Sequence, residues 1–146
     1  KVKKSISLLI KLKRIFANVK VIDSLTRSLK FILSPYKMTD ITLKRKNNSI
    51  VEVTASGHTG YGESGEDIVC AGVSTLLQAS LLGLLQVAKI NVKYAVNEET
   101  GSLRFTLPQE LTDEERHDAD VILNTLLCGL QDFYTEYSDF INLEVI

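Results

Sequence analysis

The chain has 146 residues, of which 45% are hydrophobic and 24% charged, and its formal net charge is −1. This composition is typical of a soluble globular domain and excludes a fibrous, disulfide-stapled or largely disordered protein. The small net charge conceals a strong asymmetry. Residues 1–37 contain ten Lys or Arg and one acid, a balance of +9, whereas residues 38–146 contain seven Lys or Arg and seventeen acids, a balance of −10. The reversal divides the chain into two segments of different character.

The only methionine, Met38, stands at this break in composition. We expect residues 1–37 to derive from a cloning vector or from sequence upstream of the true start, because the 109 residues of 38–146 are enough for a single core. The alternative is a basic amphipathic arm, in which apolar residues recur at helical spacing around Lys11 and Lys13. Such an arm is able to lie on an anionic membrane or on RNA, and it also resembles a transit peptide.

Residues 38–146 alternate between strand-like and helix-like patterns. Strict alternation of apolar and polar side chains indicates strands, and clusters of Asn, Gly and Ser indicate the turns between them. One such cluster, residues 57–65, holds four of the chain's eight glycines. In chain order, the predicted elements are strands 41–46 and 51–55, a helix over 68–88, strands 90–96 and 103–107, a helix that begins after Thr112, and strand 141–145.

This ββαββαβ order defines the predicted fold class. Two pairs of neighbouring strands are joined by short turns, and hairpins require antiparallel pairing. We therefore expect an α+β fold, in which a small antiparallel sheet carries two long helices packed on one face.

The second predicted helix has a clear start and a clear apolar face. Thr112 and Glu115 have the spacing of a capping box, and apolar residues recur in helical phase as far as Tyr137. Cys128 falls inside this stripe and is expected to be an inert, packed thiol. His117 lies among Asp and Arg residues and is expected to be solvated.

The segment from Ile68 to Ala88 carries no charge over twenty-one residues, which is long enough to span a bilayer. Polar side chains such as Ser74 and Gln78 interrupt it, and no Trp or Tyr anchors its ends. We therefore expect a buried core helix and no membrane association. A helix that is apolar on all sides must be covered, so part of its surface is also expected to meet a second subunit.

His58 and Cys70 stand where they are able to cooperate. His58 ends a strand and opens the glycine-rich loop, and Cys70 falls in the first helical turn if Asp67 is the N-cap. Unpaired backbone N–H groups and the helix dipole favour a thiolate there and are able to hold an oxyanion. An imidazole nearby would favour the thiolate further and later protonate a leaving amine. Cysteine is also a common buried residue, so the pair alone does not establish catalysis.

Asp67 has two candidate roles at this point in the chain. It either caps the helix, which is an ordinary role for Asp, or reaches His58 and orients the imidazole as the third member of a triad.

Neither metal binding nor secretion is indicated by the cysteines and histidines. Their spacing contains no paired-cysteine or His-x₃-His motif, so we expect no zinc and no other cofactor. Two cysteines without the spacing of a secreted disulfide framework indicate a reducing, cytoplasmic setting.

The stretch from Ser56 to Ser74, SGHTGYGESGEDIVCAGVS, resembles the signature of the bacterial ribosomal-processing cysteine protease family, Prp. That signature pairs a Gly-His start with Gly-x-Asp-Ile-Val-Cys-Ala-x-Val-Ser, and both halves are intact here. The resemblance covers residues 38–146 and none of residues 1–37. It implies that 38–146 form the cysteine protease domain, with the ββαββαβ fold of the family.

The resemblance implies a homodimeric cysteine endopeptidase. Such enzymes remove a short N-terminal extension from a large-subunit ribosomal protein during ribosome maturation, and they cut after an aromatic residue. Cys70 is then the nucleophile and His58 the general base or acid, with Asp67 and Ser74 in supporting polar positions. The loop over 59–65 is expected to be the mobile cover of the substrate groove. The residues expected to act in this substrate loop are Gly60, Tyr61, Gly62 and Gly65.

The acidic balance of residues 38–146 agrees with a ribosomal-protein substrate. Such a substrate is basic, and opposite charge raises the rate of encounter. Direct binding of nucleic acid would instead need a basic face, so we expect none. The alternative function is a non-catalytic ribosome-assembly adaptor that binds the same segment without cutting it.

Overall fold

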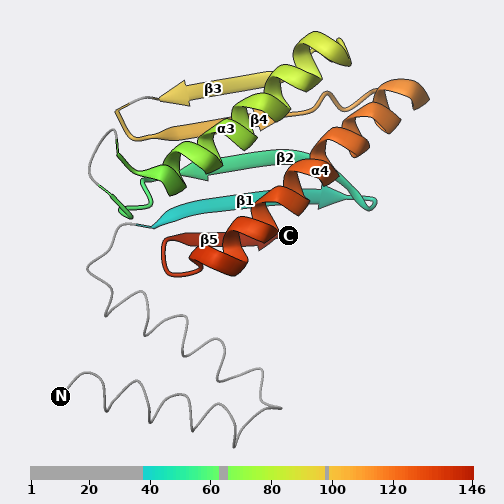
Figure 1. Ribbon diagram of the computed structural model, residues 1–146. Helices are drawn as coiled ribbons and strands as arrows, with labels where there is room; N and C mark the ends of the chain where they lie inside the picture. The colour runs from blue at the N-terminus through green and yellow to red at the C-terminus, as the bar shows by residue number, and fades with distance from the viewer. Residues whose placement is uncertain (1–37, 63–65, 98) are drawn as a thin grey trace, which may run out of the picture. The chain divides into compact units, whose positions relative to one another are not determined.

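A five-stranded mixed sheet carries two helices on one face (Figure 1). The computed structural model describes residues 38–62, 66–97 and 99–146. The expectations for residues 1–37, and for Gly65 of the loop, lie outside the described residues and stay predictions. The element order ββαββαβ and the α+β class are confirmed.

The first two strands form the predicted hairpin. Strand β1 (Thr39–Lys46) pairs antiparallel with β2 (Ser49–Ser56), and Lys46 lies opposite Ser49. The two turn residues, Asn47 and Asn48, have φ angles of 50° and 69°. Asn adopts this left-handed conformation more readily than most residues, and the two-residue turn that it forms matches the twist of the strands.

The sheet order is β3-β4-β2-β1-β5, and the last strand corrects one expectation. Strands β3 (Lys93–Asn97) and β4 (Ser102–Thr106) form the second antiparallel hairpin. Strand β5 (Ile141–Val145), however, pairs parallel with β1, so the expectation of a wholly antiparallel sheet was wrong. The reason is the long crossover between β4 and β5, since the intervening helix runs back along the sheet and returns the chain to the end at which β4 began.

That crossover is α4 (Asp113–Tyr137), and it begins at the predicted capping box. The Thr112 hydroxyl accepts the Glu115 backbone N–H at 3.2 Å, and the Glu115 carboxylate accepts the Thr112 N–H at 2.8 Å. The expectation for Cys128 was wrong, because its side chain is exposed. The buried positions 119, 123, 126, 127 and 130 recur every three or four residues, and position 128 falls outside that stripe. His117 is exposed, as predicted.

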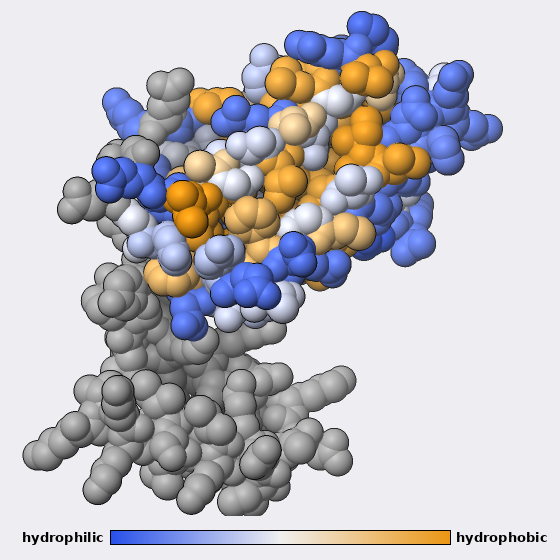
Figure 2. All heavy atoms as spheres, viewed as in Figure 1, coloured by the Kyte–Doolittle hydropathy of each residue, from blue (hydrophilic) through white to orange (hydrophobic). Residues whose placement is uncertain are grey.

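The uncharged segment forms α3 (Ile68–Leu82) and a π-helical turn, η1 (Gly83–Val87). Only one side of it is buried, through side chains spaced four residues apart from Val69 to Leu81. By length and composition alone, Ile68–Val87 is long and apolar enough to cross a membrane. Within its most apolar stretch of 18 residues, 28% is buried inside the structure. The outer side stays apolar and exposed, and Figure 2 shows hydrophobic side chains gathered over this helical layer.

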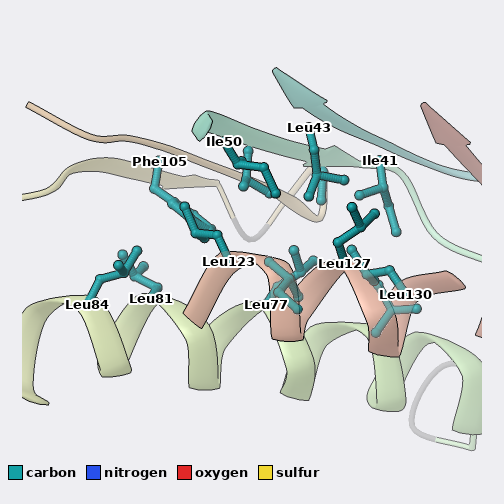
Figure 3. Close-up of a cluster of buried hydrophobic side chains, with 14 of the residues drawn as sticks. Ile41, Leu43, Ile50, Leu77, Leu81, Leu84, Phe105, Leu123, Leu127 and Leu130 are labelled. Atoms are coloured by element: carbon teal, nitrogen blue, oxygen red, sulfur yellow. The ribbon is translucent and has the colours of Figure 1, made fainter. Parts of the chain in front are cut away.

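The core lies between the sheet and both helices, as Figure 3 shows. Ile41 and Leu43 of β1 point from the sheet toward Leu77 of α3 and Leu127 of α4. Burying a side chain of this size contributes about 1.5–3 kcal/mol. This packing fixes α3 above the sheet and thereby fixes the place of its first turn, where Cys70 lies.

The two helices approach closely because glycines face the neighbouring helix. A Cβ built on Gly72 of α3 would lie 2.4 Å from Cζ of Phe133 on α4. A Cβ on Gly129 of α4 would lie 3.2 Å from a methyl carbon of Leu76. Side chains at these positions would push the helices apart, so the glycines set the interhelical distance.

Candidate active site

His58 follows the end of β2 at a sharp change in chain direction. Gly57, the residue before it, has a φ angle of +89°, and a Cβ there would lie 2.7 Å from the carbonyl oxygen of Met38. Only glycine fits this combination of backbone angle and close approach. The turn projects the His58 side chain to the surface at the end of the sheet, where it is exposed.

Asp67 is the N-cap of α3, one of its two predicted roles. Its Oδ1 accepts the backbone N–H of Cys70 at 2.8 Å. Its Oδ2 accepts the Thr59 hydroxyl at 2.6 Å and the Tyr61 backbone N–H at 3.1 Å. The carboxylate thus ties the first turn of α3 to the loop that follows His58. Among the described residues, no hydrogen bond joins Asp67 to His58, so the structure supports the cap and not the triad member.

The hydrogen bonds also determine the charge state of Asp67. Burial raises the pKa of its carboxyl group, but the donors from Cys70, Thr59, Gly62 and Tyr61 together hold that pKa below its ordinary value. A carboxylate that accepts several hydrogen bonds is stabilised in its charged form. Asp67 is therefore ionised at neutral pH.

Cys70, His58 and Ser74 line one cleft of about 250 Å³. Cys70 is partly buried, and Ser74 lies one helical turn further along α3 on the same side. The structure thus brings together three of the predicted site residues, although no hydrogen bond joins Cys70 to His58 in the part of the chain that it describes. Such bonds are often long before substrate binds.

The opposite wall of the cleft comes from the β3–β4 hairpin, which sequence reasoning missed. Val96, Asn97 and Gly101 to Leu103 all line the cleft. They reach it because β4 pairs with β2, which places Leu103 opposite Ala55 near the end of β2. The only signal in the sequence was the turn over 97–101, and a turn does not reveal which strand its hairpin joins.

The described loop residues lie away from this cleft. The Tyr61 ring contacts Tyr137 and Phe140 edge-on, with centroid distances of 5.6 Å and 5.2 Å. A Cβ on Gly62 would lie 3.1–3.3 Å from backbone atoms of Glu66 and Asp67. Gly60, Tyr61 and Gly62 are not among the residues that line the cleft, so their role as a cover stays a prediction.

No three His, Cys, Asp or Glu side chains come close enough to hold a metal ion in the described ranges. The groups in the cleft are instead a thiol in the first turn of a helix, an imidazole and a hydroxyl. A thiol and an imidazole in one cleft are the groups required for nucleophilic attack on an acyl carbon. The fold and the cleft therefore define a cysteine hydrolase.

The comparison with protein families gives the particular class of hydrolase. Residues 38–142 match the family model for the cysteine protease Prp. The chain therefore belongs to this family, and its activity is that of a cysteine protease.

Individual relatives agree with this assignment. The ribosomal processing cysteine protease Prp of Bacillus subtilis is 27% identical over 109 residues, which cover 74% of this chain and 96% of that protein. The protein of the same name from Staphylococcus aureus (strain NCTC 8325 / PS 47) is 30% identical over 104 residues, covering 71% of this chain and 93% of its own.

Two solved structures have a similar fold. The essential ribosomal processing protease Prp from S. aureus, in complex with a covalently linked product peptide, superposes with a TM-score of 0.67 at 26% identity. Its complex with a substrate peptide gives a TM-score of 0.63 at 25% identity. Each comparison covers 75% of this chain and 100% of the other.

Proposed function

We propose that this cysteine protease removes a short N-terminal extension from a large-subunit ribosomal protein in the cytoplasm. The observation that carries the proposal is that Cys70, in the first turn of α3, and His58 line the same cleft. The relatives' names, which specify ribosomal processing, support the substrate. The two free thiols support a reducing compartment.

In the proposed reaction, Cys70 is the nucleophile and His58 carries the proton. The imidazole takes the thiol proton, and the thiolate sulfur attacks the carbonyl carbon of the scissile peptide bond. His58 then gives the proton to the departing amine, which leaves an acyl-enzyme. Water releases the acyl group, with His58 taking a proton from the water and returning one to the sulfur.

Asp67 and Ser74 support this chemistry in different ways. Asp67 fixes Cys70 through the cap, but it also occupies the Cys70 N–H. That donor is therefore not free for an oxyanion, in contrast to the expectation from a bare helix N-terminus. Ser74 presents a hydroxyl inside the cleft, where we propose that it binds the substrate backbone.

The apolar part of the cleft lining supports cleavage next to an aromatic residue. Val73 and Leu77 of α3 and Val96 and Leu103 of the hairpin all line the cleft. Apolar walls beside a few polar groups are typical of sites that bind a large apolar side chain. The acidic balance of residues 38–146 supports a basic protein as the substrate, since opposite charge raises the rate of encounter.

Incubation with the extended ribosomal protein, followed by intact-mass measurement, tests this function. We expect the wild type to remove the extension and Cys70→Ala to leave it in place while staying folded. Cys128→Ala is the matched control, because this thiol is exposed on α4 and does not line the cleft. Full cleavage by Cys70→Ala would refute the proposal, and binding without cleavage by the wild type would favour the adaptor.

We also propose that the protein is a homodimer joined through the outer side of α3 and η1. Ile68, Leu82 and Val87 are 62%, 49% and 80% exposed there, in a segment without charge. Large exposed apolar side chains along one uncharged segment are typical of a protein interface. Light scattering should give a dimer for the wild type and for Val145→Glu on β5, and a monomer for Leu82→Glu. A monomeric wild type would refute the dimer.

A further inference from the structure

The imidazole of His58 has no hydrogen-bond partner among the residues that the structure describes. In triads of the Ser-His-Asp kind, a carboxylate holds the imidazole in place. Here the Asp67 carboxylate does not do this, because both of its oxygens accept hydrogen bonds from other donors. Any contact that positions the ring is therefore a packing contact and not a hydrogen bond among the described residues.

The tip of the ring lies against Gly101 in the β3–β4 turn. A Cβ built on Gly101 would lie 2.7 Å from Cε1 of His58, 2.9 Å from its Nε2 and 3.2 Å from the carbonyl oxygen of Gly57. Carbon atoms in favourable contact lie about 3.5–4.0 Å apart. A methyl group at position 101 would therefore displace the ring from its present position.

The turn that carries Gly101 is held in place on both sides. The Asn97 side-chain oxygen accepts the Thr100 backbone N–H at 3.1 Å, and the hydroxyls of Thr100 and Ser102 lie 3.0 Å apart. Gly101 itself has a φ angle of +59°. Since β4 pairs with β2, the turn and the strand that ends before His58 belong to one sheet. The sheet thus fixes both partners of the contact.

We propose that Gly101 is a positioning residue for His58. The Cα of Gly101 packs against the Cε1–Nε2 edge of the imidazole. This packing contact orients the ring in place of the hydrogen bond that a triad carboxylate would make. The consequence for catalysis rests on the proposed role of His58 as general base and acid. A side chain at position 101 would displace the ring and slow both proton transfers.

The contact itself is testable without any activity. A nuclear Overhauser effect is expected between the Hε1 proton of His58 and the Hα protons of Gly101. Gly101→Ala should lower the melting temperature, and the loss should be smaller in a His58→Ala background, where no ring stands in the way. An equal loss in both backgrounds, or no Overhauser effect, would overturn the proposal.

The effect on catalysis separates this contact from backbone strain. Gly101→Ala and Gly101→Asn both place a Cβ against the ring, although Asn tolerates a positive φ. A D-alanine at position 101, introduced by peptide ligation, accepts the same φ and directs its methyl group along the other Cα–H bond.

We expect kcat to fall by about 10²-fold for the two L-residues with KM little changed, because general acid–base catalysis typically contributes 10²–10⁴-fold. The D-alanine variant should lose much less of its kcat than Gly101→Ala, because its methyl group does not take the place that an L-Cβ takes against the ring. An equal loss with D-alanine, or a normal kcat for Gly101→Ala, would overturn the positioning role. If the wild type does not cleave at all, the proposed function fails, while the Overhauser effect and the melting temperatures still decide the contact.

Discussion

The Asp67 carboxylate accepts the backbone N–H of Cys70 at 2.8 Å, so the residue that begins α3 also fixes the residue that carries the thiol. The second oxygen of the same carboxylate holds Thr59 and Tyr61. One side chain therefore joins the helix terminus to the loop after His58. This arrangement makes the stability of the cleft depend on a single charged group.

Asp67→Ala should lower the free energy of unfolding by about 2 kcal/mol. Loss of an N-cap side chain costs about 1 kcal/mol, and the fully buried Thr59 hydroxyl loses its acceptor, which costs about 1 kcal/mol more. Urea titration measures the change. Thr112→Ala is the matched control, because it removes the N-cap of α4, where the hydroxyl is exposed, and should cost only about 1 kcal/mol. Equal losses for the two variants would contradict the role of Thr59.

The lowered pKa of Asp67 predicts a loss of stability in acid. Its pKa lies below the ordinary 3.8 in the folded protein, so the folded state binds this proton more weakly than the unfolded chain does. The contribution of the ionised Asp67 carboxylate to the free energy of unfolding is therefore complete above pH 3.8. It is lost as the pH falls through the pKa of the folded state.

The measurement is the urea midpoint of the wild type and of Asp67→Asn between neutral pH and pH 3. The difference between them should shrink as the pH falls. Glu52 and Glu115 also have lowered pKa values, through Arg104 and Thr112 respectively, but they are common to both proteins and cancel in the difference. A difference independent of pH would contradict the prediction.

The Tyr61 ring should stabilise the start of the loop through its aromatic contacts. It lies edge-on to Tyr137 and Phe140, and aromatic pairs contribute about 0.5–1.5 kcal/mol beyond the area that they bury. Tyr61→Leu should cost about 1 kcal/mol, whereas Tyr61→Phe keeps the ring and should be neutral. A double-mutant cycle with Tyr137→Leu checks the pairing, and additive losses would contradict it.

Local patterns predicted the elements of this fold well. Alternation predicted the strands, the spacing of Thr112 and Glu115 predicted the start of α4, and the N-cap of α3 was one of the two roles predicted for Asp67. Each of these depends on residues a few positions apart. The hydrogen bonds that form the element are then made within the same short segment, so the sequence contains them directly.

Pairing between distant segments was not predictable in the same way. Alternation predicts a strand but neither its neighbour nor its direction, and so the parallel pairing of β5 with β1 was missed. The same limit concealed the wall of the cleft, because only the pairing of β4 with β2 places Gly101 beside His58. Cys128 was misplaced for another reason, since a residue inside an apolar run need not lie on the buried side of the helix.

The contact between Gly72 and Phe133 predicts that the helices tolerate no added methyl group. Gly72→Ala places a Cβ 2.4 Å from the ring and should cost about 1–3 kcal/mol, the usual penalty of overpacking. The cost should fall in a Phe133→Leu background, where the ring is absent. Urea titration of the four proteins in this cycle measures both values. An equal cost in both backgrounds would show that the ring is not the obstacle.

The apolar residues that line the cleft should determine the preference for an aromatic side chain, and β3 offers a matched pair of variants. Val96 lies opposite Leu103 and lines the cleft, whereas Ala95 lies opposite Arg104 and points to the other face of the sheet. Both residues are exposed, so a charge at either position should leave the melting temperature almost unchanged.

Val96→Asp should lower kcat/KM for a peptide with an aromatic residue before the scissile bond by about tenfold or more, because a lost apolar contact in a pocket costs about 1–3 kcal/mol. Ala95→Asp should cleave the same peptide at the wild-type rate. For a peptide with Ala in place of the aromatic residue, the two variants should have the same kcat/KM, because the Ala side chain makes no contact with Val96. Equal effects of both variants on the aromatic peptide would place the binding site for that side chain elsewhere.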